Sequence, residues 1–509
     1  ARRDGVGETR TQHVRHRPHP VDQVGDRRLG LVGTEDAHAH GAVLAQVTSQ
    51  CARIDATDAH DALGAQLIIQ AARGSPARHP ARRIAHDIAS NPDAGGLVIA
   101  ADQESARAYA ELLQHIVGEK PLLVLSDDPD AGKNIAKFAD GKVEVWVASQ
   151  NGDATLAAAA EAGGVKLADV KVNKLHLGGG FGRRGQQDYT RQAVLIAKQV
   201  LGKPIKLIWS REEDMQHGYY RPITQAKMTA GLDKDGNVTA LHARLSGQSI
   251  LAHLAPSRMV NGVDQIAFQG WLADELGYMG VPNLLIDHAV RNTHVPVGFW
   301  RGVNTNQNTI YMECFIDECA NAAGKDPLEF RRAIMTKNPK QLAVLNAVAE
   351  RAGWGTPQPP GVFRGIAQNT GFGSYTAAVA EVSVSKKGEV TVQRVDIAID
   401  SGQQVNPERV RSQLEGAVVM GMGLALTAQI TFKNGRAVQD NYDTYELTRI
   451  DAAPKVINVH LVQGGSWDKP LGGVGEPGVP PVAPAIANAI FAATGRRIRQ
   501  LPMRDKLSA

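Results

Sequence analysis

The amino-acid composition changes about one hundred residues into this chain, and the change limits what each part can fold into. The 509 residues allow two to four domains at roughly 150 residues each. Residues 1–96 contain no Phe, Tyr, Trp, Lys or Met, although they hold eight of the sixteen histidines. Such a segment buries too little apolar surface to offset about 1–2 kcal/mol of ordering cost per residue. We therefore expect residues 1–96 to be a disordered tail or a foreign joined segment, with only short pieces such as Leu63–Ala72 buried.

Residues 97–141 have a more usual composition. Leu97–Ala101 and Pro121–Leu125 are apolar runs of strand length, and Gln103–Val117 has helical spacing. This pattern predicts a small α/β fragment, similar over residues 97–138 to part of the C-terminal lobe of superfamily-two helicases. A nucleic-acid-binding ATPase fragment is therefore one alternative. The chain has no GxxxxGK phosphate loop and a net charge of only +4, so we expect no nucleic-acid partner.

Residues 142–509 mix helical and strand patterns without strict alternation, which predicts an α+β domain. The expected strands are Val143–Ala148, Val170–Leu177, Ile205–Trp209, Ala377–Val384, Glu389–Ile399 and short runs near Ile430 and Ile457, with a turn at Lys387-Gly388. The expected helices are Ala154–Ala162, Asp188–Leu201, Asn308–Ala323, Pro327–Met335, Gln341–Ala352, Pro407–Ala425 and Pro481–Ala493.

The cysteines and the hydropathy pattern exclude several classes of protein. Cys51, Cys314 and Cys319 are too few for an iron–sulfur cluster, which takes about four cysteine ligands. The longest apolar stretch, Ala417–Ile430, is short and broken by glycine, so we expect no membrane span. Arg2-Arg3 is not followed by an apolar run, so the sequence predicts no export signal.

A glycine-rich loop, Leu177–Arg184, lies between an expected strand and an expected helix. Glycines let main-chain amides approach a ligand closely, and the N-terminus of the following helix favours an anion. Arg183 and Arg184 add charge-assisted donors that suit phosphate. The alternative is an ordinary glycine turn without a ligand.

A second glycine-rich segment, Gly472–Gly478, carries Glu476 just before Pro480-Pro481 and a helix of small residues. Paired prolines suit a helix start, because the first helical residue needs no amide donor. A carboxylate on such a rigid loop can have its pKa tuned by burial and can act as a base. The alternative is a solvated loop glutamate.

Three further motifs are each typical of ordinary packed or solvated residues when taken alone. Phe299–Gly302 includes Arg301 and precedes a helix, and Val410–Ala417 lies inside a helical run. Gln150 follows an expected strand.

Taken together, residues 141–503 resemble the molybdopterin-binding subunit of the xanthine dehydrogenase/aldehyde oxidase family, most of all its branch of isoquinoline 1-oxidoreductase beta subunits. The resemblance covers roughly seven tenths of the chain. It rests on motifs in the family's order, namely LGGGFGRR at 177–184, WSREEDM at 209–215, GFWRG at 298–302, FIDE at 315–318, QLEGA at 413–417 and GVGEPGVPPVAPAIANAI at 473–490.

The resemblance implies a molybdenum centre held by a molybdopterin cofactor in its cytosine dinucleotide form, with no protein ligand to the metal. Gln150 is implied to hydrogen-bond an oxo ligand near the metal. Glu476 is implied to be the catalytic base that deprotonates a molybdenum-bound hydroxyl. The implied cofactor-binding residues are Gly179, Gly180, Phe181, Gly182, Arg183, Arg301, Gln413, Glu415, Gly416 and Gly475.

The same resemblance implies a small 2Fe-2S partner subunit and hydroxylation of an N-heterocycle or an aldehyde. Purine-oxidising relatives carry a second pocket glutamate that we cannot match here, which counts against purines. Family members are often exported to the periplasm. They also carry a further half-domain that residues 1–140 do not resemble, so an inactive cofactor-binding fragment is a second alternative.

Overall fold

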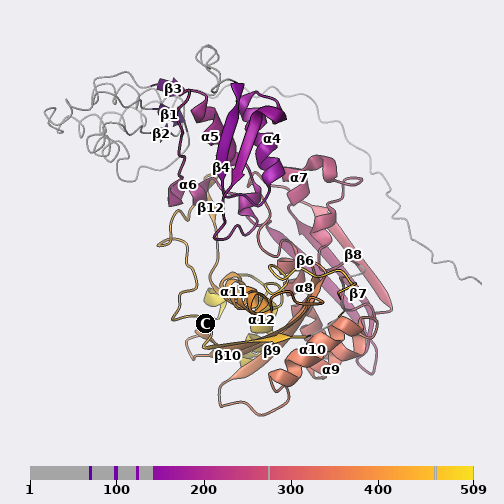
Figure 1. Ribbon diagram of the computed structural model, residues 1–509. Helices are drawn as coiled ribbons and strands as arrows, with labels where there is room; N and C mark the ends of the chain where they lie inside the picture. Colours follow the sequence, from indigo (N-terminus) through magenta and orange to yellow (C-terminus); the bar gives the residue numbers. More distant parts are fainter. Residues whose placement is uncertain are drawn as a thin grey trace, which may run out of the picture. The chain divides into compact units, whose positions relative to one another are not determined.

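The computed structural model describes the chain from Gly141 to Leu507, apart from residues 273–274, 463–464 and 466. Before Gly141 it describes only the backbone of three short strands. The chain divides into two compact units, Ala1–Ala131 and Gly132–Ala509 (Figure 1).

The first unit contains a small parallel sheet. Its strands are β1 (Ile68–Ala71), β2 (Leu97–Ala100) and β3 (Leu122–Val124), in the order β2-β1-β3. This sheet confirms the strands expected at Leu97–Ala101 and Pro121–Leu125, and β1 lies within the stretch Leu63–Ala72. The expected helix Gln103–Val117 lies outside the described residues. The interpretation of residues 1–96 as disordered or foreign also falls outside them, apart from β1.

The second unit holds the other described helices and strands, which mix as the α+β prediction expects. Its strands are β4 (Val143–Val147), β5 (Val170–Lys174), β6 (Thr224–Leu232), β7 (Val238–Gly247), β8 (Asn283–Val290), β9 (Phe363–Gly371), β10 (Ser374–Val384), β11 (Val390–Asp400), β12 (Phe432–Lys433), β13 (Arg436–Ala437) and β14 (Val456–Leu461). Its α-helices are α4 (Gly152–Gly163), α5 (Asp188–Ala197), α6 (Arg211–Gln216), α7 (Ile250–Leu254), α8 (Thr305–Ala322), α9 (Pro327–Ile334), α10 (Pro339–Arg351), α11 (Pro407–Leu426) and α12 (Val482–Thr494).

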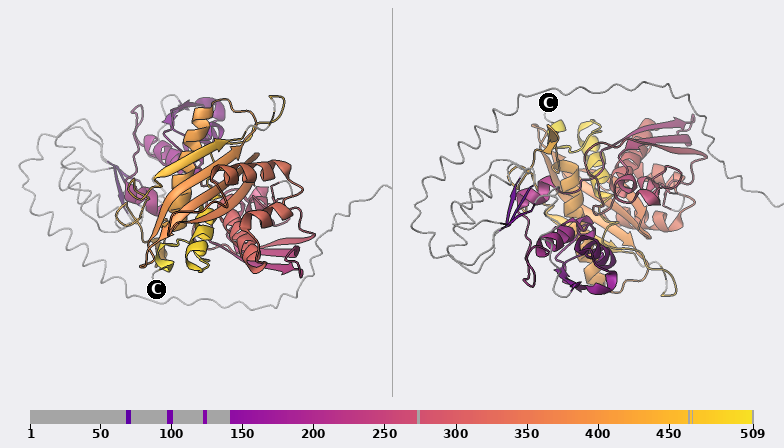
Figure 2. Two further views of the ribbon diagram at one scale, coloured as in Figure 1. Left: turned by 90° about the horizontal axis from the view of Figure 1, so that it is seen from below. Right: turned by 90° about the horizontal axis from the view of Figure 1, so that it is seen from above.

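A four-stranded sheet in the order β14-β11-β10-β9 carries the main core of the second unit. β9, β10 and β11 form an antiparallel meander, and β14 pairs with β11 in parallel. Successive residues of a strand point to opposite faces. Accordingly, Ala377 and Val379 pack in the core formed with α10, whereas Ala378 and Ala380 pack in the core formed with α11 and α12. Helices therefore cover both faces of this sheet (Figure 2).

The sequence patterns give no prediction for a second sheet, in the order β6-β7-β8. β6 and β7 are antiparallel, and β8 runs parallel to β7. β7 buries Leu241, Ala243 and Leu245, while the residues between them are more exposed. β6 reads Thr-Gln-Ala-Lys-Met-Thr-Ala-Gly-Leu, with Thr, Gln and Lys among its apolar residues. Because one face of such a sheet stays solvated, polar residues dilute the apolar pattern.

The first segment of the second unit is a β–α–β arrangement that positions Gln150. β4 and β5 pair in parallel, with α4 between them in sequence. Val143, Ala159 and Val194 form a small core that joins β4, α4 and α5. The side chain of Asn151 caps α4 by accepting from Ala154 N at 3.0 Å. Gln150 therefore lies at the carboxyl end of β4, one residue before a capped helix.

The strand expected at Ile205–Trp209 is wrong. Ile205, Leu207 and Trp209 are half-buried and the residues between them are exposed, as strand alternation predicts. No described strand pairs with this segment. The segment and β4 line the same cavity of about 1090 Å³, which separates them. Alternation therefore fixes an extended backbone here, but a strand also needs a hydrogen-bonded neighbour. The other predicted elements of this unit are present, with ends that differ by a few residues.

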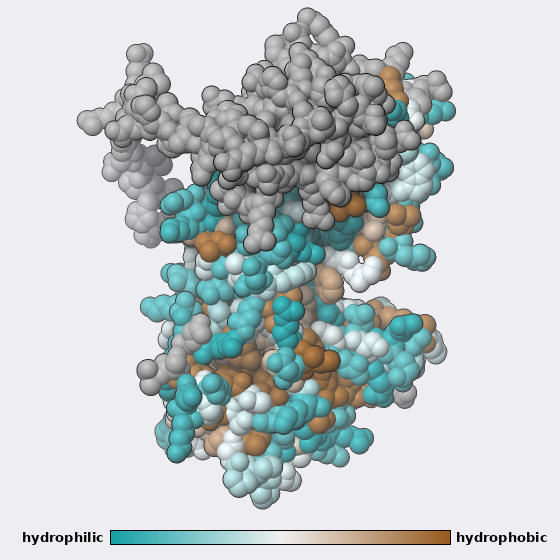
Figure 3. Space-filling view, turned by 90° about the vertical axis from the view of Figure 1, so that its left-hand side faces the viewer, coloured by the Kyte–Doolittle hydropathy of each residue, from teal (hydrophilic) through white to brown (hydrophobic). Residues whose placement is uncertain are grey.

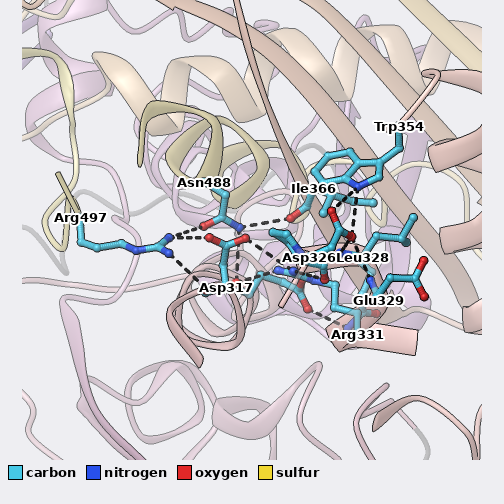
Figure 4. A network of polar contacts seen from close by, with 12 residues as sticks. Asp317, Asp326, Leu328, Glu329, Arg331, Trp354, Ile366, Asn488 and Arg497 are labelled. Atoms are coloured by element: carbon cyan, nitrogen blue, oxygen red, sulfur yellow. Dashed lines mark hydrogen bonds and ion pairs between the residues drawn. The ribbon is translucent and has the colours of Figure 1, made fainter. Parts of the chain in front are cut away.

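A buried polar network joins α8, α9 and α12 (Figure 4). Arg331 is fully buried, and its Nε donates to Glu313 Oε2 at 2.9 Å. Arg497 Nη1 donates to Asp317 Oδ2 at 2.6 Å, and Asn488 Nδ2 donates to Glu313 O at 3.4 Å. Removing one partner of a buried ion pair is strongly destabilising, because the other charge is left without compensation. The network therefore fixes α8 and α12, which follow two loops of the candidate site.

Asp396 on β11 provides a test of how charge stabilises the main sheet. Burial alone would raise the pKa of its carboxyl, but hydrogen bonds from His460, Arg394 and Asn458 outweigh burial and lower that pKa. A lowered pKa in the folded state gives stability that is present above the unfolded pKa and is lost as pH falls through the folded pKa. We expect Asp396→Asn to cost about 1.5–3 kcal/mol at pH 7. Denaturant unfolding should show this difference shrinking below about pH 4, and a difference independent of pH would contradict it.

No helix among the described residues is long and apolar enough to cross a membrane. Figure 3 shows one face of the molecule, on which an apolar area is bordered by hydrophilic residues. Several large apolar side chains are exposed elsewhere, among them Trp146, Phe181, Ile208, Ile450 and Trp467.

Candidate functional site

The structure brings together the five segments that the sequence singles out. They are Gln150, the loop 179–184, the loop 298–302, the first half of α11 and the loop 472–478. Main-chain and side-chain hydrogen bonds connect them, so that residues more than three hundred positions apart in sequence meet at one place.

The glycine loop folds tightly against Gln150 and the 298–302 loop. Gly182 N donates to Gln150 Oε1 at 2.9 Å. A Cβ on Gly180 would overlap the side-chain amide of Gln150, and a Cβ on Gly182 would overlap the carbonyl oxygen of Phe299. Gly182 also has a φ of 93°, which disfavours any side chain. Glycine is therefore required at these two positions by close approach of neighbouring chain.

Phe181 and Gly179 complete the bend of this loop. Phe181 has a φ of 52°, and its side chain is 47% exposed. Gly179 has a φ of 136°, and a Cβ there would lie 2.7 Å from the Phe181 ring. The Phe181 ring thus folds over Gly179, while its carbonyl accepts from Arg301 N at 2.9 Å.

Gln150 is held from behind by a buried polar network. Ser149 Oγ is fully buried and accepts from Thr155 Oγ1 at 3.0 Å and from Gln187 Nε2 at 3.2 Å. Gln150 N donates to Arg184 O at 3.0 Å. Because Gln150 Oε1 accepts from the glycine loop, the amide orientation follows from this bond. Gln150 Nε2 has no hydrogen-bond partner within the described part of the chain.

Both arginines of the glycine loop are used within the protein. Arg183 is buried and pairs with Asp188 through two hydrogen bonds of 3.1 and 2.8 Å. Arg184 Nε donates to Ala148 O at 3.0 Å, and its guanidinium lies 4.3 Å from the Tyr189 ring centre. These contacts favour a structural role for the two side chains over the phosphate contact that the sequence suggests.

Arg301 links three of the five segments. Its Nε donates to Gly475 O at 2.6 Å, and its Nη2 donates to Gln413 O at 2.9 Å and to Gln413 Oε1 at 3.3 Å. A Cβ on Gly416 would lie 3.8 Å from Arg301 Nη1. Since Arg301 N also bonds to Phe181 O, this one buried residue ties the glycine loop, α11 and the Glu476 loop together.

The loop that carries Glu476 is anchored to the β9–β10 hairpin. Gly473 N donates to Phe372 O at 2.8 Å, and Ser374 Oγ donates to Gly473 O at 2.6 Å. Thr376 Oγ1 donates to Pro477 O at 2.8 Å. These bonds hold the chain on both sides of Glu476.

The Glu476 carboxylate is half-buried among two arginines. Its Oε1 accepts from Gly302 N at 3.0 Å. Burial lowers the pKa of the Arg301 guanidinium, and the Glu476 carboxylate opposes that effect. Burial also lowers the pKa of Arg221 to about 10, while Tyr445 and Glu476 act to raise it. Glu476 therefore lies close to two guanidinium groups whose charges are poorly solvated.

The expected residues of α11 do not contribute equally. Gln413, Glu415 and Gly416 are all exposed. Gln413 and Gly416 lie against Arg301, as described above. Glu415 has no described hydrogen bond or ion pair and takes no part in the network of contacts. Within the described residues, no group of three or more His, Cys, Asp or Glu side chains is arranged to hold a metal ion.

Several residues of the site are not predicted from the sequence. Arg221 Nη2 and Asn306 Nδ2 both donate to Arg301 O at 2.8 Å. Thr155 and Gln187 form the network behind Gln150. A lone loop arginine or a helical asparagine carries no signal of its own, since such residues are mostly solvated. Only the three-dimensional contacts distinguish them.

Two family descriptions match this chain, and both read molybdopterin cofactor-binding domain. The first matches residues 130–335 and the second matches residues 325–454. The matched residues include Gln150, the glycine loop, Arg301 and the Gln413–Gly416 segment.

Curated relatives carry related names. The chain is 31% identical to the beta subunit of isoquinoline 1-oxidoreductase from Brevundimonas diminuta, over 74% of this chain and 48% of the relative. It is 32% identical to the membrane-bound aldehyde dehydrogenase (pyrroloquinoline-quinone) of Gluconacetobacter polyoxogenes, over 81% of this chain and 56% of the relative. It is 28% identical to a nicotinate dehydrogenase subunit of Pseudomonas putida, over 86% and 37%. The chain thus spans about half, or less, of the length of these relatives.

Solved structures share the fold. Quinoline 2-oxidoreductase from Pseudomonas putida 86 superposes with a TM-score of 0.61 at 14% identity, covering 73% of this chain and 72% of that one. Aldehyde oxidoreductase from Desulfovibrio gigas gives a TM-score of 0.60 at 17% identity, covering 72% and 57%. Residues 130–454 are therefore molybdopterin cofactor-binding domains, and the chain belongs to the xanthine dehydrogenase/aldehyde oxidase family of molybdenum oxidoreductases.

Proposed function

We propose that this chain is the molybdenum subunit of a hydroxylase or dehydrogenase that inserts water-derived oxygen at an electron-poor carbon. The proposed substrate is an N-heterocycle or an aldehyde, a class supported by relatives named for isoquinoline, nicotinate and aldehyde. The observation that carries the proposal is the Glu476 carboxylate, which is held by Gly302 N–H where the five sequence motifs meet.

The described residues fit a large cofactor with many hydrogen-bonding atoms. Gly180 and Gly182 keep side chains away from the glycine loop, so its main chain can lie against a ligand. Gln150 Nε2 and the exposed amide of Gln413 are donors on either side of Arg301. We propose that these residues, with Gly416 and Gly475, hold molybdopterin in its cytosine dinucleotide form.

The proposed chemistry divides between the cofactor and two side chains. When bound, the cofactor supplies a redox-active metal that makes coordinated water more acidic. Glu476 would accept a proton at Oε2, since Oε1 already accepts from Gly302 N–H. Gln150 would donate from Nε2 to an oxygen at the reacting centre, because its Oε1 is engaged by Gly182. The loop contacts of Glu476 would keep its carboxylate at one position between turnovers.

The reaction must also pass on electrons. Converting a carbon–hydrogen bond and water into a hydroxylated carbon releases two electrons and two protons. Three cysteines in the whole chain are too few for an iron–sulfur cluster. We therefore propose a separate small 2Fe-2S subunit as the electron acceptor, as the subunit names of the relatives support.

An isotope experiment tests this function. The chain is co-expressed with a 2Fe-2S subunit, loaded with molybdenum, and assayed with isoquinoline and benzaldehyde in oxygen-18 water with an artificial electron acceptor. We expect product that contains oxygen-18, with reduction of the acceptor. Molybdenum-loaded protein that gives no product with either substrate would contradict the proposal and favour an inactive cofactor-binding fragment.

A further inference from the structure

The peptide unit between Arg301 and Gly302 is held at both of its polar ends. Its carbonyl oxygen accepts from Arg221 Nη2 and from Asn306 Nδ2, each at 2.8 Å. Its N–H donates to Glu476 Oε1 at 3.0 Å. A cation and an amide therefore bind one end of a peptide group whose other end binds the carboxylate.

Arg221 is built into this position by the chain around it. Tyr220 N donates to Pro296 O at 2.9 Å, and Gly298 N donates to Tyr220 O at 3.0 Å. Trp300 Nε1 donates to Tyr219 O at 2.8 Å. The stretch before Arg221 thus runs alongside the 298–302 loop, and this pairing places the guanidinium at the carbonyl.

Asn306 and Gly302 restrict the same peptide from the other side. Asn306 lies in the first turn of α8 and is buried. Gly302 has a φ of 83°, and a Cβ there would overlap the Asn306 side chain. Because no side chain fits at this φ and place, the peptide can turn its N–H toward Glu476 only with glycine here.

We propose that Arg221 is a positioning residue that, with Asn306, holds the Arg301–Gly302 peptide so that its N–H points at Glu476. A cation at the carbonyl oxygen also polarises the peptide and strengthens its N–H as a donor, because hydrogen bonds in series reinforce one another. This inference rests on the proposed role of Glu476 as the base, and it explains how that carboxylate keeps one orientation.

Other charged groups also face Glu476. Arg301 extends from the 298–302 loop, and Tyr445 lies near Arg221. The 472–478 loop also contacts Ser401 and Leu414, and the acidic side chains closest in sequence to those contacts are Asp400 and Glu415. The variants below leave all four of these groups unchanged.

The test is a pH titration of the Glu476 carboxyl by difference infrared spectroscopy on the full chain without cofactor. The Glu476→Gln variant assigns the band. Arg221→Gln removes the cation, so we expect the apparent pKa of Glu476 to rise by about one unit. Arg221→Lys keeps a point charge and should shift that pKa less. Asn306→Leu, which removes the second donor, should raise it by a smaller amount than Arg221→Gln does.

Arg496→Gln is the matched control, because Arg496 also donates to main-chain carbonyls, of Leu507 and Lys506, and is not part of the site. It should leave the titration unchanged. The proposal is wrong if Arg221→Gln is folded and titrates like the native chain. If Arg221→Gln does not fold, an unchanged titration in Asn306→Leu and Arg221→Lys overturns it instead. Since the titration needs neither cofactor nor turnover, a failure of the proposed function would not be mistaken for a failure here.

Discussion

Replacing Glu476 by Gln is expected to lower kcat/KM about 100-fold or more, while molybdenum content stays at the native level. Glutamine keeps the size of the side chain and can still accept from Gly302 N–H through its amide oxygen. It cannot accept a proton at the pH of the assay. Because the loop is anchored through Phe372, Ser374 and Thr376 rather than through the carboxylate, the variant should fold normally.

The control for this variant is Glu350→Gln, which changes an exposed glutamate on α10 by the same chemistry. It should retain the native rate. Turnover, molybdenum content and thermal unfolding are measured on the same preparations. A Glu476→Gln enzyme that retains a near-native rate at full molybdenum occupancy would show that Glu476 is not the base.

Replacing Gly182 by Ala is expected to reduce molybdenum content at least about tenfold. The added Cβ would overlap the carbonyl oxygen of Phe299, which is main chain and cannot rotate away. The φ of 93° adds backbone strain of about 1–3 kcal/mol for a residue with a side chain. Because about 1.4 kcal/mol corresponds to a tenfold change in affinity, this strain alone accounts for the loss.

Gly185→Ala is the matched control three residues further along. No neighbouring atom lies within 4 Å of a Cβ at Gly185, and its φ is not positive. We expect native molybdenum content for this variant. Equal content in the two alanine variants would mean that the close approach of the glycine loop to Phe299 does not matter for cofactor binding.

The sequence predicts most helices and the strands of the main sheet, because both faces of that sheet are buried. β10 and β11 are therefore nearly continuous apolar runs that end at a recognisable turn. The sheet of β6, β7 and β8 has a solvated face, and its mixed pattern is not distinctive. Ile205–Trp209 shows the opposite case, in which a correct alternation lacks a partner strand.

The candidate site is predicted in part because its motifs are glycine-rich and their geometry has few solutions. Gly180, Gly182 and Glu476 fall where close approach or an anchored loop requires them. Arg183 shows the limit of such reasoning, since its charge suggests phosphate but Asp188 occupies its guanidinium. Arg221 could not be predicted, because its role depends on one carbonyl eighty residues away in sequence.

The most direct test of the account is the cofactor content of the purified full chain. The chain is produced in a host that loads a known molybdenum hydroxylase, and molybdenum is measured together with the nucleotide released on acid hydrolysis. We predict near-stoichiometric molybdenum accompanied by cytidine monophosphate, with both reduced in Gly182→Ala and unchanged in Glu476→Gln. Folded chain that contains neither molybdenum nor a pterin, from a host in which the known enzyme is loaded, would contradict the account.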